Sequence, residues 1–472
     1  MNIELLKCSV NSSIRDALKI INNNLRGTVF VVNEEDKVYG VVTDGDVRRA
    51  LLNGYGLNDS IKVIIKPDFI YARDDEGLED INSKFTSAIK IMPVVDKNMR
   101  LVNYAEFHEK VHLPLVSPQL DGNEYKYLMD AFFSTWISSK GEYITRFENS
   151  FAEYCGMRYG VATSNGTTAL HLALVALGIG EGDEVIVPDL TFAATINAVI
   201  YTGATPVIVD VEEDGWCMSP EALEDAITGA TKAVIPVHVY GQPCDMGSIC
   251  SIAKEHNLFI VEDCAEAHGA EWGSQKVGSF GVISCFSFFG NKVITTGEGG
   301  MCLTDSEELR QKMMHYRDHG MSNRRRYYHD VVGFNYRMTN LQAAIGVAQV
   351  ERIDDILEWR KNIEERFFEH LSHIRGVEIQ HKDLKNRKKI AWLVSILIEA
   401  EARERVVEAL ENQGIEVRLF FSPLSKMEIY RKYAKNCIVS CNIAKRGINL
   451  PTTHEISDET IKRIAMTIEE NI

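Results

Sequence analysis

Between about residues 184 and 261 the sequence alternates short apolar runs with segments of helical spacing, and this alternation limits the possible folds most. The apolar runs are Glu184–Val187, Pro206–Asp210, Ala233–Val237 and Leu258–Val261, and helical spacing covers Thr191–Tyr201. Strands that are apolar on both faces need helices on both sides. The pattern therefore predicts an α/β fold with a mostly parallel sheet, in which the chemistry collects at the carboxyl ends of the strands.

The last third of the chain has a different pattern. From about Leu341 the apolar residues follow helical spacing, with a long amphipathic stretch over 352–363. Further strand and helix patterns run from Ala391 to Ile472. We therefore predict that residues 114–360 form a large α/β domain and that residues 361–472 form a smaller C-terminal α/β domain.

The first 113 residues contain an internal repeat. Val31–Val38 aligns with Val94–Leu101 at a constant offset of 63 residues. Each copy has the pattern of a short apolar strand, a polar turn, a second strand and a helix. Two copies can bury one shared core that neither could bury alone. Because Pro114 and Pro118 favour an extended connection, we place the end of this module before them. We therefore predict an α+β module over 1–113.

Charge and composition exclude several classes of protein. The chain has 51 basic and 67 acidic residues, a net charge of −16, which disfavours binding to nucleic acid. No apolar run approaches the roughly 20 residues of a membrane-spanning helix, and Met1–Lys7 does not resemble a secretory signal. Ten scattered cysteines, several in apolar segments, indicate reduced thiols and a cytoplasmic protein. Arg324–Arg326 could bind an anion, although a solvated loop is the default interpretation.

Four segments carry the candidate chemistry. The first, Ser164–Leu172, begins with small polar residues and continues as an apolar helix. Free backbone N–H groups and hydroxyls gather at such a helix start, which suits a phosphate group. An ordinary helix cap is an equally good interpretation of this segment alone.

The second segment, Phe259–His268, places the carboxylate of Asp263 directly after a buried strand. A buried carboxylate is costly unless it has a partner, and a protonated pyridine nitrogen would be a suitable one. A helix-capping aspartate is the alternative interpretation.

The third segment, Phe286–Gly300, contains Lys292 among aromatic and glycine residues. Desolvation would lower the pKa of this lysine and make its amine a nucleophile towards an aldehyde. A surface lysine in a turn is the alternative. The fourth segment, Gly333–Ala344, is a polar loop that opens a helix, and its chemistry alone indicates no function.

In their order along the chain, the four segments resemble the DegT/DnrJ/EryC1/StrS family of sugar aminotransferases. The similarity runs from about Leu115 to the C-terminus, and Ser287–Gly300 and Gly333–Ala344 are its most specific parts. The resemblance implies PLP fold type I, the aspartate aminotransferase-like α/β fold with large and small domains. It also implies pyridoxal 5'-phosphate (PLP) as the cofactor and a homodimer or higher homo-oligomer.

The resemblance assigns roles to individual residues. Lys292 would join the cofactor covalently and move a proton, and Asp263 would keep the pyridine nitrogen protonated. Phe192 would stack on the ring, with a core aromatic as the alternative. The remaining cofactor contacts implied in this way are Gly166, Thr167 and Ser287 at the phosphate, Asn335 at the phosphate of a neighbouring subunit's cofactor, and Glu266, where many relatives carry glutamine, near the ring oxygen or substrate.

The implied reaction is amino transfer from L-glutamate to the C4 keto group of a GDP-linked 4-keto-6-deoxy sugar. A related dehydratase has histidine in place of the lysine, so Lys292 favours amino transfer over removal of a hydroxyl. A UDP-linked or 3-keto sugar nucleotide is an alternative substrate, and a non-catalytic nucleotide sensor is an alternative function. His238, Tyr240, His319 and Arg337 lie in loops that could contact the sugar or nucleotide.

The N-terminal repeat resembles a tandem pair of CBS domains, which implies that Thr43 and Asp46 contact a nucleotide ribose. The second copy has Glu106 and Glu109 at these positions, so at most one such site is expected. A structural or dimerising role for the module is the alternative. His108–His112 matches the H-E-x-x-H zinc signature, but Pro114 cuts the helix short and no third ligand is evident, so we predict no metal.

Overall fold

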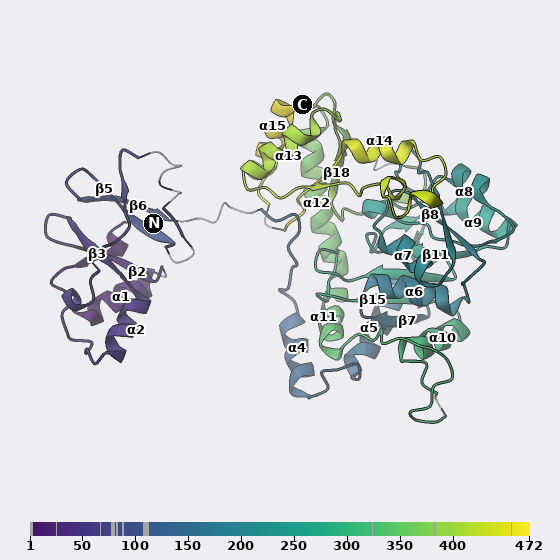
Figure 1. The fold of residues 1–472 in the computed structure, drawn as a ribbon, viewed down its shortest axis with the longest axis horizontal. Helices are drawn as coiled ribbons and strands as arrows, with labels where there is room; N and C mark the ends of the chain where they lie inside the picture. Colours follow the sequence, from purple (N-terminus) through teal and green to yellow (C-terminus); the bar gives the residue numbers. More distant parts are fainter. Residues whose placement is uncertain are drawn as a thin grey trace. The chain divides into compact units, whose positions relative to one another are not determined.

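The computed structural model describes residues 3–24, 26–66, 68–76, 81, 84–86, 89–106, 113–322, 324–380, 384–454 and 456–472. Contacts divide the chain into two compact units, Met1–Val111 and His112–Ile472, here called unit 1 and unit 2 (Figure 1). Among the described residues, no helix has both the length and the apolar character needed to cross a membrane.

Unit 1 contains two small sheets of three strands each, with the orders β1-β2-β3 and β4-β5-β6. In each sheet the first strand pairs parallel to the second, and the second pairs antiparallel to the third. Its elements are η1 (Ile3–Leu6), β1 (Lys7–Ser9), α1 (Ile14–Asn24), β2 (Thr28–Val32), β3 (Val38–Thr43), α2 (Asp44–Leu52), η2 (Ile61–Val63), β4 (Ala72–Arg73), β5 (Ile91–Val95) and β6 (Leu101–Glu106).

The predicted repeat is visible in the strand register. The β2–β3 ladder has an irregularity between Val31 and Val32, and the β5–β6 ladder has one between Val94 and Val95. These positions are equivalent at the offset of 63 residues that the sequence shows. The two copies therefore share local backbone detail as well as strand order, which confirms the repeat.

The two copies meet at their hairpin turns. The Val38 amide donates to the Met99 carbonyl at 3.0 Å, and the Leu101 amide donates to the Asp36 carbonyl at 2.9 Å. These bonds exchange equivalent positions, as an approximate two-fold relation requires. A buried apolar cluster with members from both copies lies beside the turns, so the copies share a core as predicted: Leu6, Phe30, Val32, Val38, Ile91, Val95 and Leu101.

Unit 2 is built on a seven-stranded sheet with the order β7-β15-β14-β11-β10-β8-β9. β15 runs antiparallel to both of its neighbours, and the other described pairs are parallel, which confirms the mostly parallel sheet. The strands are β7 (Tyr159–Thr163), β8 (Glu184–Pro188), β9 (Thr205–Val209), β10 (Thr231–Val234), β11 (Phe259–Asp263), β14 (Ile283–Ser287) and β15 (Gly300–Thr304).

Both faces of this sheet are buried, as the continuous apolar runs predict. In β8, Val185 and Val187 belong to one apolar cluster and Ile186 belongs to another, because successive side chains point to opposite faces. The helices and short helical turns of this part of unit 2 are α4 (Glu124–Phe133), α5 (Glu142–Cys155), α6 (Gly166–Ala176), α7 (Ala194–Tyr201), α8 (Pro220–Ala226), η3 (Val239–Gly241), α9 (Met246–Glu255), α10 (Glu307–Arg317) and α11 (Asn340–Val350).

The C-terminal part of unit 2 has a four-stranded antiparallel sheet, β16-β18-β20-β19, with its own apolar cluster. α12 (Ile353–Leu371) runs through the predicted boundary at residue 360, so the division into large and small domains stays a prediction. The remaining elements are β12 (Glu271–Trp272), β13 (Gln275–Lys276), β16 (Glu378–Ile379), β17 (Arg387–Lys388), β18 (Val394–Leu397), α13 (Arg403–Asn412), β19 (Arg418–Leu419), η4 (Leu424–Lys426), η5 (Arg431–Tyr433), α14 (Val439–Arg446), β20 (Gly447–Leu450) and α15 (Asp458–Asn471).

Candidate active site

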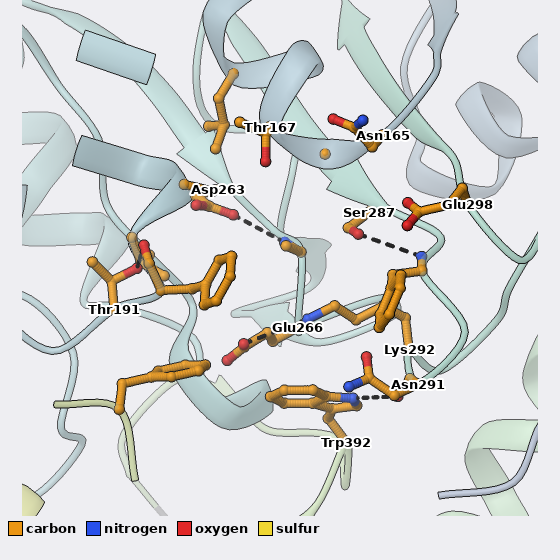
Figure 2. A pocket seen from close by; sticks show the side chains of 18 of the residues that line it. Asn165, Thr167, Thr191, Asp263, Glu266, Ser287, Asn291, Lys292, Glu298 and Trp392 are labelled. Carbon is orange, nitrogen blue, oxygen red and sulfur yellow. Dashed lines mark hydrogen bonds and ion pairs between the residues drawn. The ribbon is translucent and has the colours of Figure 1, made fainter. Parts of the chain in front are cut away.

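A cavity of about 440 Å³ lies at the carboxyl ends of the parallel strands of unit 2 (Figure 2). This volume is within the usual range for sites that hold a small molecule. The segments that follow β7, β8, β11 and β14 contribute to its wall. Seven of the residues singled out in the sequence line this cavity together: Gly166, Thr167, Phe192, Asp263, Glu266, Ser287 and Lys292.

One end of the cavity is the start of α6. Asn165 caps this helix and accepts a hydrogen bond from the Thr168 amide at 2.9 Å, leaving the amides of Gly166 and Thr167 at the first two helical positions. A Cβ on Gly166 would lie 2.8 Å from the Cβ of Ser287, so glycine permits this close approach. Free amides, hydroxyls and a neutral first turn suit an anionic group.

Asp263 ends β11 and is 5% exposed. Its carboxylate accepts hydrogen bonds from Thr195 Oγ1 at 2.8 Å and from the Ala265 amide at 3.2 Å. Burial raises the pKa of Asp263, and these hydrogen bonds and the charge of Lys292 oppose the rise. A cationic ligand group in the cavity would stabilise this carboxylate further.

Lys292 follows β14, and its side chain is only 12% exposed. Its Nζ lies 3.5 Å from Glu266 Oε1 and 4.1 Å from the centroid of the Trp392 ring. Burial lowers the pKa of the Lys292 amine, while the charges of Glu266 and Asp263 oppose this effect. A lowered pKa increases the fraction of neutral amine, which is the nucleophilic form.

Trp392 and Arg418 also line the cavity, and the sequence did not single them out. The indole Nε1 of Trp392 donates to the Asn291 carbonyl at 2.7 Å and so fixes the indole beside Lys292. Both residues are about 100 or more positions from Lys292 in the chain. A local pattern could not have found them, because only folding brings the C-terminal part of unit 2 to the site.

Other predicted contact residues of unit 2 lie elsewhere. Asn335 is exposed and is not among the described residues that line the cavity. Arg337 binds Asp318 at 2.8 Å and His319 at 3.2 Å. Arg324–Arg326 are exposed, and the last two lie over neighbouring tyrosine rings.

His238 is fully buried, and Tyr240 is 1% exposed. His238, Glu262 and Cys264 lie close enough together to be ligands of one metal ion. The Glu262 carboxylate already accepts bonds from His238 Nε2 and from three backbone amides at 2.7 Å, and His238 Nδ1 accepts from the Cys244 amide. This cluster is therefore a satisfied hydrogen-bond network.

In unit 1, Thr43 and Asp46 form a capping box at the start of α2. The Asp46 carboxylate also binds Arg49 and Lys66, at 2.5 Å and 2.6 Å. Burial raises the pKa of Asp46, but these hydrogen bonds outweigh burial and bring the pKa to about 2. In the second copy Glu106 pairs with Arg26 at 2.7 Å. Glu109 and the H-E-x-x-H match lie outside the described residues.

Known proteins are similar to this chain over most of its length. Residues 118–469 match the DegT/DnrJ/EryC1/StrS aminotransferase family, and residues 1–53 match the CBS domain. The chain is 47% identical over 361 residues to the GDP-perosamine synthase of Escherichia coli O157:H7, covering 76% of this chain and 98% of the relative.

Two further similarities bear on the site. The UDP-N-acetyl-3-dehydro-alpha-D-glucosamine 3-aminotransferase of Acidithiobacillus ferrooxidans is 40% identical over 69% of this chain and 87% of its own length. The structure of the putative sugar aminotransferase Spr1654 from Streptococcus pneumoniae in its PLP form matches with a TM-score of 0.72 and 26% identity, covering 76% of this chain and 98% of that chain.

The residues of the cavity fit PLP. The neutral start of α6 with Ser287 suits its phosphate, the buried carboxylate of Asp263 suits a protonated pyridine nitrogen, and the Lys292 amine suits its aldehyde. In Figure 2, Asn165 and Thr167 lie at the top of the view, Glu266 and Lys292 lie below them, and Trp392 lies at the bottom. The cavity thus has an end that suits an anion, a buried carboxylate and a desolvated amine.

Proposed function

The chain belongs to the DegT/DnrJ/EryC1/StrS aminotransferase family, and we propose that it aminates the C4 keto group of a GDP-linked 4-keto-6-deoxy sugar. It is a PLP-dependent aminotransferase. In this proposal L-glutamate is the amino donor and the product is a GDP-linked amino sugar of the perosamine type. The observation that carries the proposal is the 47% identity to a GDP-perosamine synthase over 98% of that relative.

In the proposed reaction, Lys292 holds the cofactor through its amine and moves the proton that leaves the substrate carbon. Bound PLP supplies a conjugated ring that delocalises the electron pair of the broken C–H bond. The carboxylate of Asp263 favours a proton on the pyridine nitrogen, because an ion pair offsets the cost of burying that carboxylate. Gly166, Thr167 and Ser287 bind the phosphate.

The face of the ring and the neighbouring subunit complete the proposed site. Phe192, which lines the cavity and is 61% exposed, stacks on the ring. Asn335 reaches the cofactor phosphate of the neighbouring subunit in a homodimer. This assembly is supported by exposed apolar side chains in and after α4, where Phe133 and Trp136 are 73% and 58% exposed.

Arg418 is the proposed partner of the donor's carboxylate. Among the described residues that line the cavity, Lys292 and Arg418 are the cations. Arg418 approaches Glu416 only to 3.9 Å, and its side chain is 42% exposed, so its guanidinium can bind another anion. The α-carboxylate of glutamate is one bond from the carbon that carries the amino group, so a cation near Lys292 suits it.

Activity on a panel of keto sugars tests the proposed substrate. The purified enzyme is incubated with L-glutamate and GDP- or UDP-linked 4-keto and 3-keto sugars, and the products are identified by mass spectrometry. We expect the GDP-linked 4-keto-6-deoxy sugar to be aminated with the highest kcat/KM. A clear preference for another sugar nucleotide contradicts the proposal.

A UDP-linked 3-keto sugar is the second candidate substrate. It is favoured by the 40% identity to the 3-aminotransferase of Acidithiobacillus ferrooxidans. In the panel experiment this alternative predicts amination at C3 of the UDP sugar. The position of the new amino group, read from fragment masses, separates the two candidates.

The proposed setting of the reaction is the cytoplasm, which is supported by ten free cysteines. A nucleotide at Thr43 and Asp46 in unit 1 stays a prediction. It would have to displace Lys66 or Arg49 from the Asp46 carboxylate, because that carboxylate already accepts bonds from both of these cations and from Thr43.

A further inference from the structure

Glu266 forms an ion pair with Lys292, whereas the resemblance to the family places this residue near the ring oxygen or the substrate. Within the described part of the chain, the ion pair that Lys292 makes is with Glu266, at 3.5 Å between Nζ and Oε1. The two side chains are 12% and 5% exposed. Water therefore does little to screen the interaction between the carboxylate and the amine.

Burial opposes the charged form of both partners. It raises the pKa of Glu266 and lowers the pKa of Lys292, while the charge of each partner opposes the effect of burial on the other. Carboxylate with ammonium and carboxylic acid with neutral amine have the same total charge and the same number of protons. The two states differ only in the position of one proton. Such a pair titrates as a unit.

A constrained backbone turn holds Glu266 in place. The other carboxylate oxygen, Oε2, accepts a hydrogen bond from the Tyr240 amide at 2.9 Å. Tyr240 has left-handed dihedral angles, φ 52° and ψ 29°, which are strained for a tyrosine. Gly241 follows at φ 85°, where a Cβ would lie 2.2 Å from the Ile390 carbonyl oxygen.

The aromatic ring of Tyr240 packs against the ring of Trp392, which lies beside the Lys292 amine. It lies 6.2 Å from the Trp392 ring with nearly parallel planes, and Trp392 contacts the Lys292 ammonium. The strained residue thus directs its amide to Glu266 and packs its ring on the indole beside Lys292. Both neighbours of the amine therefore contact this one turn.

We propose that Glu266 and Lys292 form a proton-sharing pair, in which the Glu266 carboxylate sets the pH at which the Lys292 nitrogen loses its proton. In the transfer, the ammonium of Lys292 gives one proton to the carboxylate, leaving a neutral amine and a neutral carboxylic acid. While it is charged, the carboxylate stabilises the ammonium, so the nitrogen loses its proton at a higher pH than it would without Glu266. The inference rests on the proposed role of Lys292 in joining the cofactor.

Other charged groups act on the same nitrogen. The charge of Asp263 favours the protonated amine, and the charge of Arg418 disfavours it. Glu298 lines the same cavity but makes no ion pair with Lys292 among the described residues. Glu266→Gln is therefore the informative change, since it removes the charge and keeps the shape, and Glu298→Gln is the matched control.

The test is a pH titration of the full-length holoenzyme, followed through the visible absorbance of bound PLP, which changes when the linking nitrogen loses its proton. Glu266→Gln is expected to lower the apparent pKa of this nitrogen by about 1–3 units, because an opposite charge is removed from its vicinity. Glu298→Gln is expected to produce a much smaller shift. An unchanged titration in Glu266→Gln, or equal shifts in both variants, overturns the proposal.

A second measurement needs no bound cofactor. In full-length protein freed of PLP, the labelling rate of Lys292 by an amine-selective reagent is measured against pH by mass spectrometry. The proposal predicts faster labelling of Glu266→Gln at neutral pH, whereas a purely structural role predicts no lowering of the amine pKa. Neither readout involves a sugar, so failure of the sugar panel leaves this test intact.

Discussion

Two helices of this chain begin with the same hydrogen-bonding device but with different charge. α2 in unit 1 starts with a capping box between Thr43 and Asp46, and α6 in unit 2 starts with one between Asn165 and Thr168. The third residue of α2 is a carboxylate that binds two cations, whereas the third residue of α6 is neutral.

The difference shows how one local motif serves two purposes. A helix start carries a partial positive charge that favours an anion. In α2 the Asp46 carboxylate provides that anion from within the chain. In α6 the neutral first turn faces the cavity, so its free amides remain available to an anionic ligand. The capping pattern predicts a helix start, and the charge of its third residue decides whether the chain itself supplies an anion there.

The largest effect is expected from removing the chemistry of unit 2. Lys292→Ala should lower turnover by about 10²–10⁴-fold or more, because it removes the residue that is proposed to join the cofactor and move the proton. Thr43→Ala in unit 1 serves as the comparison and should leave the visible absorbance of bound PLP unchanged. Initial rates and absorbance spectra measure both effects. Full turnover in Lys292→Ala would refute the catalytic assignment.

As the pH falls, the contribution of His268 to the stability of unit 2 should be lost before that of Asp46 to unit 1. Burial lowers the pKa of His268 to about 3, although a backbone hydrogen bond at Ser287 opposes this shift. The unfolded chain binds a proton at this histidine below about pH 6.5, so the stability contributed by the neutral ring is present above that pH. It is lost as the pH falls towards 3. In unit 1, Asp46 with its pKa of about 2 should keep its contribution until the pH falls below its ordinary 3.8.

Comparison with His268→Leu separates the pH-dependent stability that His268 contributes from the contributions of other titratable groups. Between pH 6.5 and 4.5 the wild type should lose about 2–3 kcal/mol more stability than the variant, at about 1.36 kcal/mol per pKa unit. Chemical denaturation with hydrogen exchange resolved to each unit measures it. Parallel pH profiles for the two proteins would show that His268 does not contribute.

Giving α6 the charge of α2 should weaken cofactor binding. Thr168→Asp places a carboxylate at the position equivalent to Asp46, and Thr168→Asn is the neutral control of similar shape. PLP affinity should fall by roughly 10-fold in the aspartate variant only, because a charge at a helix start interacts by about 0.3–2 kcal/mol. Equal affinities of the two variants for PLP would contradict an anion site at α6.

The smallest effect is expected from breaking the cap in unit 1. Thr43→Ala should lower the stability of unit 1 by about 0.5–2 kcal/mol, the usual contribution of a helix cap. Hydrogen exchange of the α2 amides in the full chain measures this change. Protection that stays at the wild-type level would show that the capping box contributes little.

Several features of the fold could be predicted from local patterns. The apolar runs Glu184–Val187 and Leu258–Val261 predicted buried strands, and the structure has β8 and β11 at these positions. The predicted helix at Thr191 begins at Ala194 instead, since Thr191 bonds with Thr195 through their hydroxyls at 2.9 Å. Helix boundaries are less predictable than helices, because side-chain bonds at the ends compete with the first turn.

The candidate site divides in the same way. Lys292, Asp263 and Gly166 lie in segments whose composition indicates their chemistry, and they line one cavity because parallel strands end at the same edge of the sheet. Arg418 and Trp392 carry no such local signal. For His238 the local pattern misled. This loop histidine was expected to be able to contact the substrate, but it is fully buried and hydrogen-bonds to Glu262.

The amino-acid sequence by itself determined the repeat of unit 1, the mostly parallel sheet of unit 2 and the position of Lys292 as the candidate reactive lysine, because periodicity and composition act over short stretches of chain. The tertiary structure alone decided which partners these groups meet. It placed Lys66 on Asp46 and Glu266 on Lys292. Partners are decided at this level because the strength of a charge depends on burial and on neighbours that only the folded chain brings together.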